Sequence, residues 1–466
     1  MILLEIFTWV FVGYNFAINL SYITLNLISI VSLVYKNQEN LLHKLPQSYS
    51  EFEYPISLLV PAYNEEATIV TSIKSMLQLK YSAIEIVVVN DGSKDGTLAA
   101  LNAAFKLLQI TKSKLDLIQT QTVRGLYQSS QYPNLFVIDK KNGGKADSLN
   151  AGINFSNSPL FCAVDADSIL ERTALQRLAK PFMRDPQMVV TGGTIRVANG
   201  CKVNQGNLTH IGLSTNPLAL LQVVEYLRAF LFGRLGWSRL NANLIVSGAF
   251  GLFKKEKIIE VGGYKTNTIG EDMELIVRLH RILRSRGEEC PIEFVPDSVC
   301  WTEVPEDIKT LRNQRIRWQR GLCESLYANK GLLFSKTGGA AGWVAFPFML
   351  IFEAFGPLLE IVGYSSLFLA VVFDYISWNT FLLLTASTVI IGVLLSTSAL
   401  ALEEFSFHTY PKISQLIVLW LVGIIESFGY RQLNTYWRLI GLYKWVAQTE
   451  AQWGKMTRKG SWQAKN

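Results

Sequence analysis

Long uncharged runs constrain this chain more than any other feature. Residues 6–35 carry no charged side chain, and further apolar runs lie near 341–373, 380–402 and 413–430. About 20 apolar residues suffice to cross the hydrocarbon core of a bilayer, so these runs are long enough for membrane helices. A secretory signal would be shorter and would end at a small-residue cleavage site, which the first run lacks, so we expect a retained span. The sequence predicts a membrane protein.

Basic residues beside the runs predict how the chain is oriented. Glu5 precedes the first run, whereas Lys36 and Lys44 follow it. By the positive-inside rule, the segment after the first run lies in the cytoplasm. The chain after residue 430 is also rich in lysine and arginine, which predicts a cytoplasmic C-terminal end. We therefore expect a multi-pass protein of the cell (inner or plasma) membrane with a cytoplasmic soluble domain.

The apolar runs leave the number of crossings open. Three crossings after a cytoplasmic domain would place the C-terminal end outside, against its basic composition. The run at 341–373 is longer than one span requires and carries Glu353, Glu360 and a central Gly356-Pro357. We therefore expect this run to hold two elements, an interfacial or re-entrant piece and a span.

These features divide the chain into four expected segments. Between the first and the later runs the composition is that of an ordinary globular domain, and the net charge of +7 fits a basic face beside anionic lipid. No basic patch with interleaved aromatic residues stands apart from the membrane flanks, so no nucleic-acid partner is expected. The segments are an N-terminal transmembrane helix (1–36), a cytoplasmic domain (50–325), interfacial and transmembrane helices (326–432) and a basic cytoplasmic tail (433–466).

Cysteine and histidine usage excludes two kinds of site. The five cysteines lack C-x-x-C spacing and fall in the expected cytoplasmic domain, so disulfides are not expected. The four histidines are scattered, which argues against a zinc cluster.

Apolar strands alternate with helices in the first part of the soluble domain. Strands without polar alternation are buried on both faces, and strand–helix alternation is typical of a parallel sheet, so we expect a doubly wound α/β fold. Helices are expected near residues 65–79 and 96–109. The expected strands are "ISLLVPAYNE", "IEIVVVNDGS", "NLFVIDKKNGGK" and "PLFCAVDADS".

Charged residues follow the ends of these strands. Glu65 follows the first strand, Asp91 ends the second, Lys145 follows the third, and Asp165 and Asp167 end the fourth. Ligands of open parallel sheets bind beyond the carboxyl ends of the strands. Each residue alone has an ordinary structural explanation, but together they predict one crevice.

The "VDADS" stretch predicts a divalent metal site. Asp165 and Asp167 are two residues apart, which places both carboxylates on one side of an extended strand end. Two such oxygen ligands suit Mg²⁺ or Mn²⁺ shared with substrate phosphates. The "NGGKA" stretch lacks the spacing of a P-loop, which argues against ATP or GTP hydrolysis.

Two later stretches carry further candidates. In "TIGEDMELIVRLHR" a helix begins with Glu271 and Asp272, which either complement the helix dipole or supply a general base. In "LIVSGAFGLFKKE" the small residues Ser247 and Gly248 interrupt an expected strand, and would let a bulky ligand approach the backbone.

The stretch "LRNQRIRWQRG" crowds arginines around Trp318 shortly before the second apolar run. Trp318 alone would be read as an anchor at the membrane interface. For Arg315 and Arg320 we expect contact with lipid headgroups.

The motifs "PAYNEE", "VVVNDGSKDGT", "GGKADSLNAG", "DADS", "GEDMEL" and "QRIRW" occur together in one order. In that order and rough spacing, residues 50–325 resemble membrane-bound, processive family 2 glycosyltransferases such as poly-N-acetylglucosamine, hyaluronan and cellulose synthases. The resemblance implies a GT-A (Rossmann-like) fold, and inverting sugar transfer from a nucleotide sugar, most often a UDP-sugar.

The resemblance also implies roles on the donor side. Asp91 would bind the uridine, beside Glu65 and the backbone after Pro61, and Lys145 and Asp165 would face the nucleotide. Asp167 would hold the divalent metal on the diphosphate, which Gln314 and Arg317 would also contact.

On the acceptor side, the resemblance makes Asp272 the base that takes the proton from the attacking hydroxyl, and places Trp318 under the acceptor sugar. A base on one face of the anomeric carbon and a stabilised diphosphate on the other are what in-line displacement requires. Further acceptor contacts are expected from Ser247, Gly248 and Glu271.

Three functions are compatible with these motifs. The first is a synthase that extends a β-linked polysaccharide and passes it through its own membrane segments. The second is a glycosyltransferase that uses the same site once on a lipid acceptor. The third, a transporter or scaffold with a degenerate enzyme domain, is disfavoured because the acids are intact. UDP-N-acetylglucosamine and UDP-glucose both stay open as donors.

Overall fold

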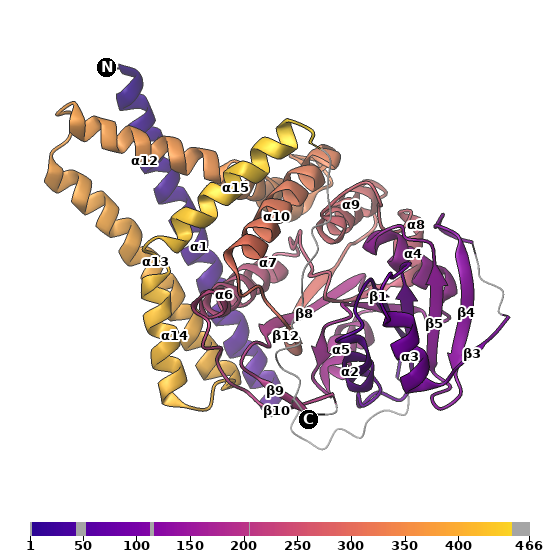
Figure 1. The fold of residues 1–466 in the computed structure, drawn as a ribbon. Helices are drawn as coiled ribbons and strands as arrows, with labels where there is room; N and C mark the ends of the chain where they lie inside the picture. Colours follow the sequence, from indigo (N-terminus) through magenta and orange to yellow (C-terminus); the bar gives the residue numbers. More distant parts are fainter. Residues whose placement is uncertain (1, 43–52, 112–115, 205, 450–466) are drawn as a thin grey trace.

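The computed structural model describes residues 2–42, 53–111, 116–204 and 206–449. Figure 1 shows two parts side by side: an α/β part built around a sheet, and a group of long helices that includes the N-terminal helix. The start of the expected soluble domain at residue 50 and residues 450–466 of the expected tail lie outside the described ranges.

The larger sheet has ten strands and is mostly parallel at its centre. The strands of this sheet and of a separate two-stranded sheet are β1 (Ile56–Ala62), β2 (Ile84–Asn90), β3 (Leu107–Gln109), β4 (Val123–Ser129), β5 (Leu135–Lys140), β6 (Leu160–Val164), β7 (Ile169–Leu170), β8 (Val190–Val197), β9 (Lys202–Asn204), β10 (Asn207–His210), β11 (Phe250–Lys254) and β12 (Ile292–Thr302). Their order across the sheet is β3-β4-β5-β2-β1-β6-β11-β8-β12-β7, and β9 pairs with β10 separately. The strands β5, β2, β1 and β6 are parallel neighbours. The expected mostly parallel α/β sheet is confirmed.

Helices cover both faces of this sheet. Those of the α/β part are α2 (Ile69–Met76), α3 (Thr97–Phe105), α4 (Lys145–Phe155), α5 (Ala174–Arg184), α6 (Pro217–Arg228), the π-helical turn η1 (Ala229–Arg234), α7 (Leu235–Arg239), α8 (Lys255–Glu260), α9 (Glu271–Ser285), α10 (Ile308–Ala328) and the short turn η2 (Lys330–Leu332).

The uninterrupted apolar run of β1 follows from this two-sided cover. Leu58 and Val60 pack into one cluster with side chains of α2, α3 and α5, whereas Leu59 packs into a second cluster with side chains of α4 and α9. Because neighbouring residues of a strand face opposite sides of the sheet, both faces must be apolar. The register aligns Leu58 with Ile86 of β2 and with Cys162 of β6.

Two expected elements differ in the structure. The helix expected over 96–109 ends at Phe105, because Lys106 has a left-handed backbone with φ of 48° and the chain reverses into β3. The stretch before β11 is not an interrupted strand. Its residues up to Ala249 form a loop, and the strand begins only at Phe250.

The remaining helices are long and apolar. They are α1 (Ile2–Leu42), η3 (Ala341–Ala345), α11 (Phe346–Phe348), η4 (Met349–Ala354), α12 (Gly356–Val372), α13 (Trp378–Phe407), α14 (Ile413–Ile425) and α15 (Tyr430–Val446). Ile6–Val34 and Trp378–Phe407 are each long and apolar enough to cross a membrane. The segments Ala341–Ala354 and Gly356–Val372 are bent by 52°, and α14 and α15 by 59°, so the described residues hold two such helices, or up to four spans if each bent pair is one.

The bend at residue 355 divides the run at 341–373 into two elements, as expected. Residues 433–446, assigned above to a basic tail, instead continue α15. Trp437 and Tyr430 of this helix pack with Leu311 and Ile316 of α10 in one buried cluster. The four-segment division of the chain stays a prediction.

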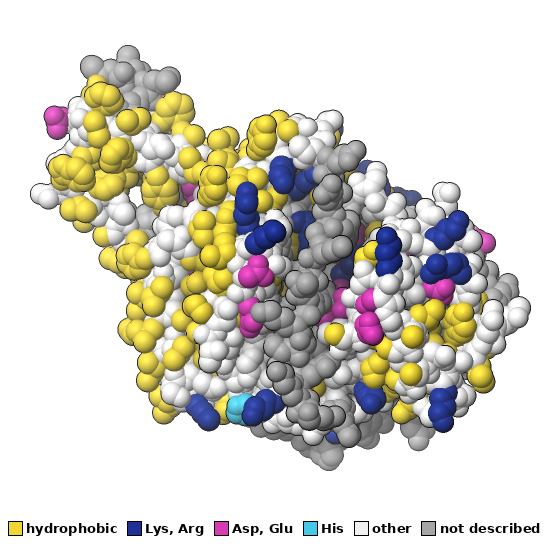
Figure 2. All heavy atoms as spheres, in the orientation of Figure 1, with side chains coloured by type: hydrophobic (Ala, Val, Ile, Leu, Met, Phe, Trp, Pro, Cys, Tyr) yellow, Lys and Arg dark blue, Asp and Glu magenta, His cyan; other side chains and the backbone are white. Residues whose placement is uncertain are grey.

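Apolar side chains cover the outer surface of the long helices. Figure 2 shows them gathered over α12, α13 and α14, while the charged side chains of this face lie mainly elsewhere. On α13, Leu383 and Leu394 are 71% and 61% exposed. An apolar surface of this extent is typical of a region that contacts lipid.

A buried histidine on α9 predicts how stability depends on pH. The imidazole of His280 lies 3.0 Å from the carbonyl of Asn243 through Nε2, and its Nδ1 accepts a hydrogen bond from Arg284 Nε at 3.2 Å. Burial, together with the charge of Arg284, lowers the pKa of His280 to about 3. In the unfolded chain His280 is therefore protonated as the pH falls below about 6.5, whereas in the folded protein it stays neutral down to about pH 3.

We expect wild-type stability to fall as the pH drops below 6.5, by up to about 1.4 kcal/mol per pH unit from this group alone. His280→Gln keeps a hydrogen-bonding side chain without the titration, so its Tm should fall less between pH 7 and 5. The measurement is thermal unfolding of the detergent-solubilised chain. His210→Gln, at an exposed position, is the control and should keep the wild-type pH slope. Equal slopes for wild type and His280→Gln would contradict the prediction.

Candidate active site

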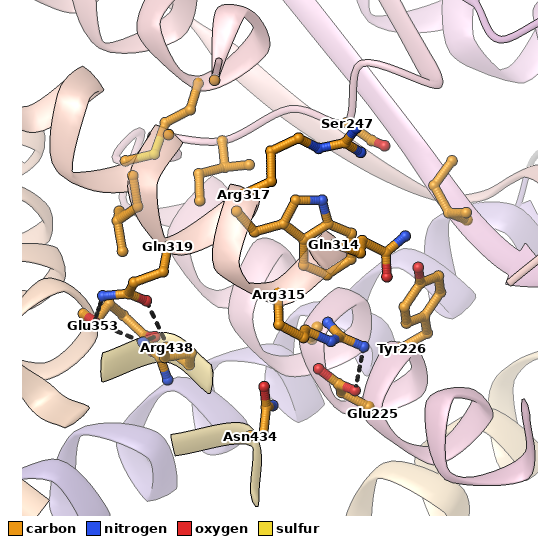
Figure 3. A pocket seen from close by; sticks show the side chains of 18 of the residues that line it. Glu225, Tyr226, Ser247, Gln314, Arg315, Arg317, Gln319, Glu353, Asn434 and Arg438 are labelled. Carbon is orange, nitrogen blue, oxygen red and sulfur yellow. Dashed lines mark hydrogen bonds and ion pairs between the residues drawn. The ribbon is translucent and has the colours of Figure 1, made fainter. Parts of the chain in front are cut away.

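One cavity of about 1480 Å³ collects the predicted site residues. It opens at the carboxyl ends of β1, β2 and β6, passes α9 and α10, and continues among residues of α1, α12, α13 and α15. Figure 3 shows the part of this cavity beside α10. The predicted residues in its wall are Pro61, Glu65, Asp91, Lys145, Asp165, Asp167, Ser247, Gly248, Glu271, Asp272, Gln314, Arg317 and Trp318.

The carboxylate of Asp91, at the end of β2, already has several hydrogen-bond donors from within the chain. It pairs with buried Lys140 and accepts the backbone N–H groups of Gly143 and Gly144 at 2.9 and 2.8 Å. A fourth donor is the side-chain amide of Asn142, at 3.0 Å. Asp91 therefore holds the loop that leads into α4, and its contact with uridine stays a prediction.

The loop after β1 is tied to the loop after β2. Asn64 has a left-handed backbone with φ of 57°, and its side chain accepts the backbone N–H of Lys94 at 2.8 Å. The next residue, Glu65, donates its own N–H to the Thr97 hydroxyl at 2.9 Å and accepts the Thr68 hydroxyl at 2.8 Å. These bonds place the Pro61–Glu65 segment at the edge of the cavity.

Lys145, the first residue of α4, links the strand ends to the start of α9. Its Nζ lies 2.5 Å from Asp165 Oδ1. Burial opposes the charge of Lys145, but Asp165, Glu271 and Asp272 outweigh it and raise the pKa of the amine. Lys145 therefore stays protonated between two groups of acids.

Asp165 and Asp167 lie in a turn directly after β6. The backbone N–H of Ser168 donates to the Asp165 carbonyl at 3.0 Å, so the extended strand end expected for this stretch is wrong. Both carboxylates still line the cavity, and Asp167 is only 4% exposed. No group of three or more candidate metal-binding side chains occurs among the described residues. Two carboxylates fit Mg²⁺ or Mn²⁺, which complete their shell with substrate phosphates and water.

Asp272 sits in the first turn of α9 and faces the loop before β11. Its Oδ2 accepts the backbone N–H of Gly248 at 3.0 Å. A Cβ at position 248 would lie 3.2 Å from Asp272 Oδ2 and 3.3 Å from Lys145 Nζ. Glycine at this position therefore lets the backbone reach both charged groups, and Ser247 beside it lines the cavity.

Glu271 is buried next to Asp272. Burial, and then the charge of Asp272, raise the pKa of Glu271 to about 7, while Lys145 and Arg317 act in the opposite direction. Glu271 therefore holds its proton to a higher pH than an ordinary carboxyl group does, a kind of shift found at proton-transfer sites.

Helix α10 presents Gln314, Arg317 and Trp318 to the cavity. The indole of Trp318 is 45% exposed. Arg315 is only 3% exposed, and its guanidinium lies 4.4 Å from the centre of the indole ring. The expected contact of Arg315 with lipid headgroups is therefore wrong. Arg320 pairs with Glu324 of the same helix at 2.7 Å.

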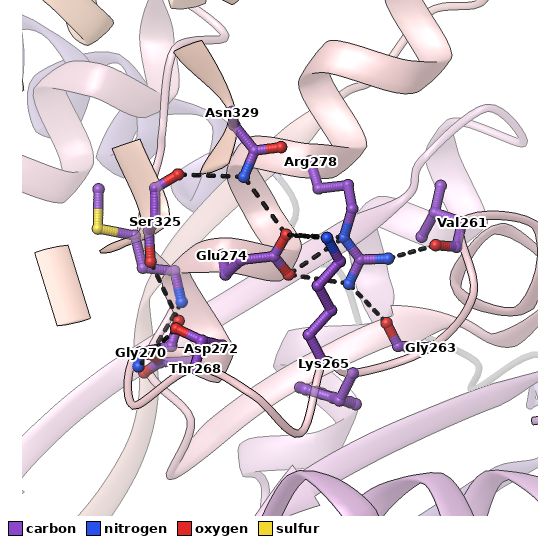
Figure 4. Close-up of polar contacts among 12 residues, drawn as sticks. Val261, Gly263, Lys265, Thr268, Gly270, Asp272, Glu274, Arg278, Ser325 and Asn329 are labelled. Carbon is purple, nitrogen blue, oxygen red and sulfur yellow. Dashed lines mark hydrogen bonds and ion pairs between the residues drawn. The ribbon is translucent and has the colours of Figure 1, made fainter. Parts of the chain in front are cut away.

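The start of α9 is held against α10 (Figure 4). Glu274 forms a buried ion pair with Arg278 at 2.9 Å, and Arg278 also donates to the carbonyl of Gly263 at 2.6 Å. A Cβ on Gly270 would lie 2.9 Å from the carbonyl oxygen of Gly321, so the two backbones touch. This contact sets the distance between Asp272 on α9 and the cavity-facing residues of α10.

Several cavity residues were missed from the sequence. Arg234 stacks on Phe230 at 3.9 Å within the π-helical turn η1, and makes no ion pair with any acid in the described ranges. Further along the cavity, Arg228 pairs with Glu426 at 2.7 Å. Glutamates within apolar runs are a functional signal that could have found Glu426, whereas nothing local marks Arg234.

Two protein-family models match this chain. Residues 57–261 match the family described as "Glycosyl transferase family 2", and residues 160–402, more than half of the chain, match "Glycosyl transferase family group 2". This chain belongs to the family 2 glycosyltransferases. The resemblance on which the site residues were selected is thereby confirmed.

Curated relatives of this family 2 glycosyltransferase include two bacterial synthases. The poly-beta-1,6-N-acetyl-D-glucosamine synthase of Staphylococcus aureus (strain COL) is 31% identical over 268 residues, covering 57% of this chain and 54% of the relative. The synthase of that name from Staphylococcus epidermidis is 30% identical over the same shares. The chain thus spans about half the length of the curated relatives it matches.

A solved structure shares the fold of this family 2 glycosyltransferase. It is a mannosyltransferase from Pyrobaculum calidifontis in complex with GDP-Man and Mn²⁺. The TM-score is 0.50 at 18% identity, over 90% of this chain and 99% of that one. The likeness supports the expected GT-A architecture with flanking apolar helices.

Proposed function

We propose that this glycosyltransferase extends a β-linked polysaccharide from a UDP-sugar, with inversion and with a divalent metal, and passes the product between its membrane helices. The observation that carries the proposal is the single cavity that joins the acids at the sheet edge, the indole of Trp318 and polar side chains of the apolar helices. The names of the staphylococcal relatives favour UDP-N-acetylglucosamine over UDP-glucose as the donor.

The proposed chemistry begins at Asp272. Its carboxylate, oriented by the Gly248 N–H at 3.0 Å, takes the proton of the acceptor hydroxyl as that oxygen attacks the anomeric carbon. Gln314 and Arg317 donate to the departing diphosphate, and protonated Lys145 adds charge beside it. A single base suits inversion, because no covalent intermediate needs a second carboxylate.

Asp165 and Asp167 would hold Mg²⁺ or Mn²⁺. When bound, the metal would supply charge that stabilises the diphosphate leaving group. The mannosyltransferase of similar fold was solved with Mn²⁺, which supports a divalent cation here without deciding between the two.

The far part of the cavity suits a neutral polymer of hydroxyl groups. Several of its charged side chains form ion pairs: Glu426 with Arg228 and Arg431 at 2.7 and 3.2 Å, and Glu353 with Arg438 at 2.8 Å. Glu360 accepts a hydrogen bond from the Thr435 hydroxyl at 2.8 Å. Polar and charged groups among membrane helices belong where they line a cavity rather than where they face lipid. We therefore place the growing chain along this wall, with the catalytic part in the cytoplasm of a cell-membrane protein.

The product formed in vesicles tests the proposal. Purified protein in lipid vesicles would receive radiolabelled UDP-N-acetylglucosamine or UDP-glucose with Mn²⁺ or Mg²⁺. We expect a high-molecular-weight, glycosidase-sensitive product from UDP-N-acetylglucosamine. A single glycolipid extractable into organic solvent would instead support the alternative, one transfer to a lipid acceptor.

Trp318→Ala is expected to reduce sugar transfer by about 10- to 100-fold while donor hydrolysis changes less than about threefold, because the ring positions the acceptor and not the donor. Both rates come from one radiolabel assay, as product and as free sugar. Trp343→Ala is the control, since this tryptophan is 53% exposed and lies outside the cavity. Equal loss of both rates would place the indole elsewhere than under the acceptor.

A further inference from the structure

A glutamate on α6 stands where three elements meet. Glu225 Oε2 accepts a hydrogen bond from Arg315 Nη2 of α10 at 2.8 Å and from the Tyr430 hydroxyl of α15 at 3.0 Å. Figure 3 shows Glu225 and Arg315 pointing toward one another in the cavity wall. Glu225 belongs to none of the sequence motifs that predicted the site.

Arg315 depends on Glu225 for its position. The Arg315 side chain is 4% exposed, and a buried guanidinium requires a compensating charge. Burial opposes its charge, but Glu225 outweighs burial, so the pKa of Arg315 lies above its usual value. Among the described acids, Glu225 is the one that forms an ion pair with it.

Arg315 in turn supports Trp318. The guanidinium lies 4.4 Å from the centre of the indole, so it covers one face of the ring and limits the rotamers that the indole can take. The indole nevertheless stays 45% exposed and lines the cavity. The ring is therefore held from behind and is open to a ligand in front.

The same carboxylate reaches the membrane helices. Tyr430 is the first residue of α15 and follows the 59° bend between α14 and α15. Gly429 at this bend has φ of 98°, a conformation that glycine adopts readily. The hydrogen bond from Tyr430 to Glu225 therefore joins the bend to the support of Trp318.

We propose that Glu225 is a positioning residue for the acceptor saccharide: through Arg315 it sets the plane of the Trp318 indole, and through Tyr430 it keeps that plane in register with α15. The inference rests on the proposed role of Trp318 at the acceptor. It adds that one carboxylate, that of Glu225, contacts both the support of the acceptor-binding indole and the first residue after the bend before α15. Neither Glu225 nor Tyr430 needs to touch the reacting atoms.

Glu225→Gln is the main test because it keeps the shape of the side chain and removes its charge. We expect the acceptor KM to rise about tenfold, and the ratio of transfer to donor hydrolysis to fall about tenfold, since a displacement of about 1 Å at a positioning group can cost up to 10²-fold. UDP affinity should stay within about twofold of wild type. Glu225→Asp, which keeps the charge, should recover part of the ratio. Arg312→Met, at an exposed position of α10 outside the cavity, is the control and matches the Arg315→Met substitution used below.

Two further variants separate positioning from general stability. Tyr430→Phe removes one hydroxyl, so it should lower the same ratio by about two- to threefold in a folded protein. The double variant Glu225→Gln/Arg315→Met should be no worse than Arg315→Met alone, because both act on one path to the indole. Additive losses, or parallel losses of UDP affinity and transfer in Glu225→Gln, would overturn the proposal, as would a wild-type ratio.

Failure of this inference differs from failure of the proposed function. The ratio of sugar transfer to donor hydrolysis can be measured with either a saccharide or a lipid acceptor. The test of Glu225 therefore does not depend on whether the product is a polysaccharide or a glycolipid. If Trp318→Ala alters this ratio and Glu225→Gln does not, only the positioning role is lost. If Trp318→Ala leaves the ratio unchanged, the acceptor site itself is misplaced.

Discussion

Asp272→Asn is expected to lower the kcat of sugar transfer by about 10³-fold or more, because removing a positioned general base costs about 10² to 10⁴. The amide keeps an oxygen that can accept the Gly248 N–H, now at 3.0 Å, so the loop before β11 should stay in place. Affinity for UDP with Mn²⁺ should change less than about threefold. Transfer is measured by radiolabel incorporation, and UDP affinity by calorimetry on the detergent-solubilised chain.

The neighbouring acid supplies a sharp alternative to this assignment. The pKa of Glu271 is raised to about 7 by burial and by Asp272, and Asp272→Asn removes the second of these causes. A base at Glu271 would therefore give Asp272→Asn a residual activity that rises with pH at a pH below 7. We expect no such rise. Glu289→Gln, at an exposed acid outside the cavity, controls for the loss of a carboxylate and should match wild type. Turnover of Asp272→Asn at the wild-type rate would show that the base lies elsewhere.

Asp167→Asn is expected to weaken metal-dependent donor binding by about 100-fold or more. Only Asp165 would then remain of the two carboxylates after β6, and it already pairs with Lys145 at 2.5 Å. Mg²⁺ and Mn²⁺ favour anionic oxygen ligands over an amide, so the substitution removes metal affinity more than shape. UDP binding with Mn²⁺ and with EDTA, measured by calorimetry, separates the metal-dependent part.

The EDTA measurement decides the outcome for Asp167. Wild type and Asp167→Asn should bind UDP with similar, weak affinity once the metal is chelated. Asp374→Asn serves as the control, since this exposed residue lies between α12 and α13, outside the cavity. Full Mn²⁺-dependent affinity in Asp167→Asn would refute the metal assignment. A loss that persists unchanged in EDTA would identify Asp167 as a structural residue of the turn.

The strands that position the site could be predicted because their environment is uniform. The strands β1, β2 and β6 are buried on both faces over most of their length, so apart from Ser57, Glu85 and Asn90 their residues are apolar and the run is visible in the sequence. β4 was missed because it mixes polar and apolar residues, with Arg124 exposed and Gln128 only partly buried. The turn at Lys106 was missed for a different reason, since lysine has no particular preference for a left-handed backbone.

The site residues show a similar division. Acids at strand ends were correctly expected to meet, because parallel strands deliver their carboxyl ends to one edge of a sheet. The direction taken by Arg315 was not predictable. Its neighbours Arg317 and Trp318 face the cavity, whereas Arg315 turns under the indole toward Glu225, which lies 90 residues earlier in the chain.

The order of the motifs along the chain and the hydrophobic pattern were thus sufficient to predict the kind of fold, the apolar helices around it and the group of acids at one sheet edge. Those features depend on periodicity and on local chemistry, which a single chain displays. The partners of Asp91, the contact of Gly248 with Asp272 and the support behind Trp318 depend on which surfaces pack together. Such contacts arise when distant segments share a small volume, and the free energy of that packing is not encoded in any one stretch of residues.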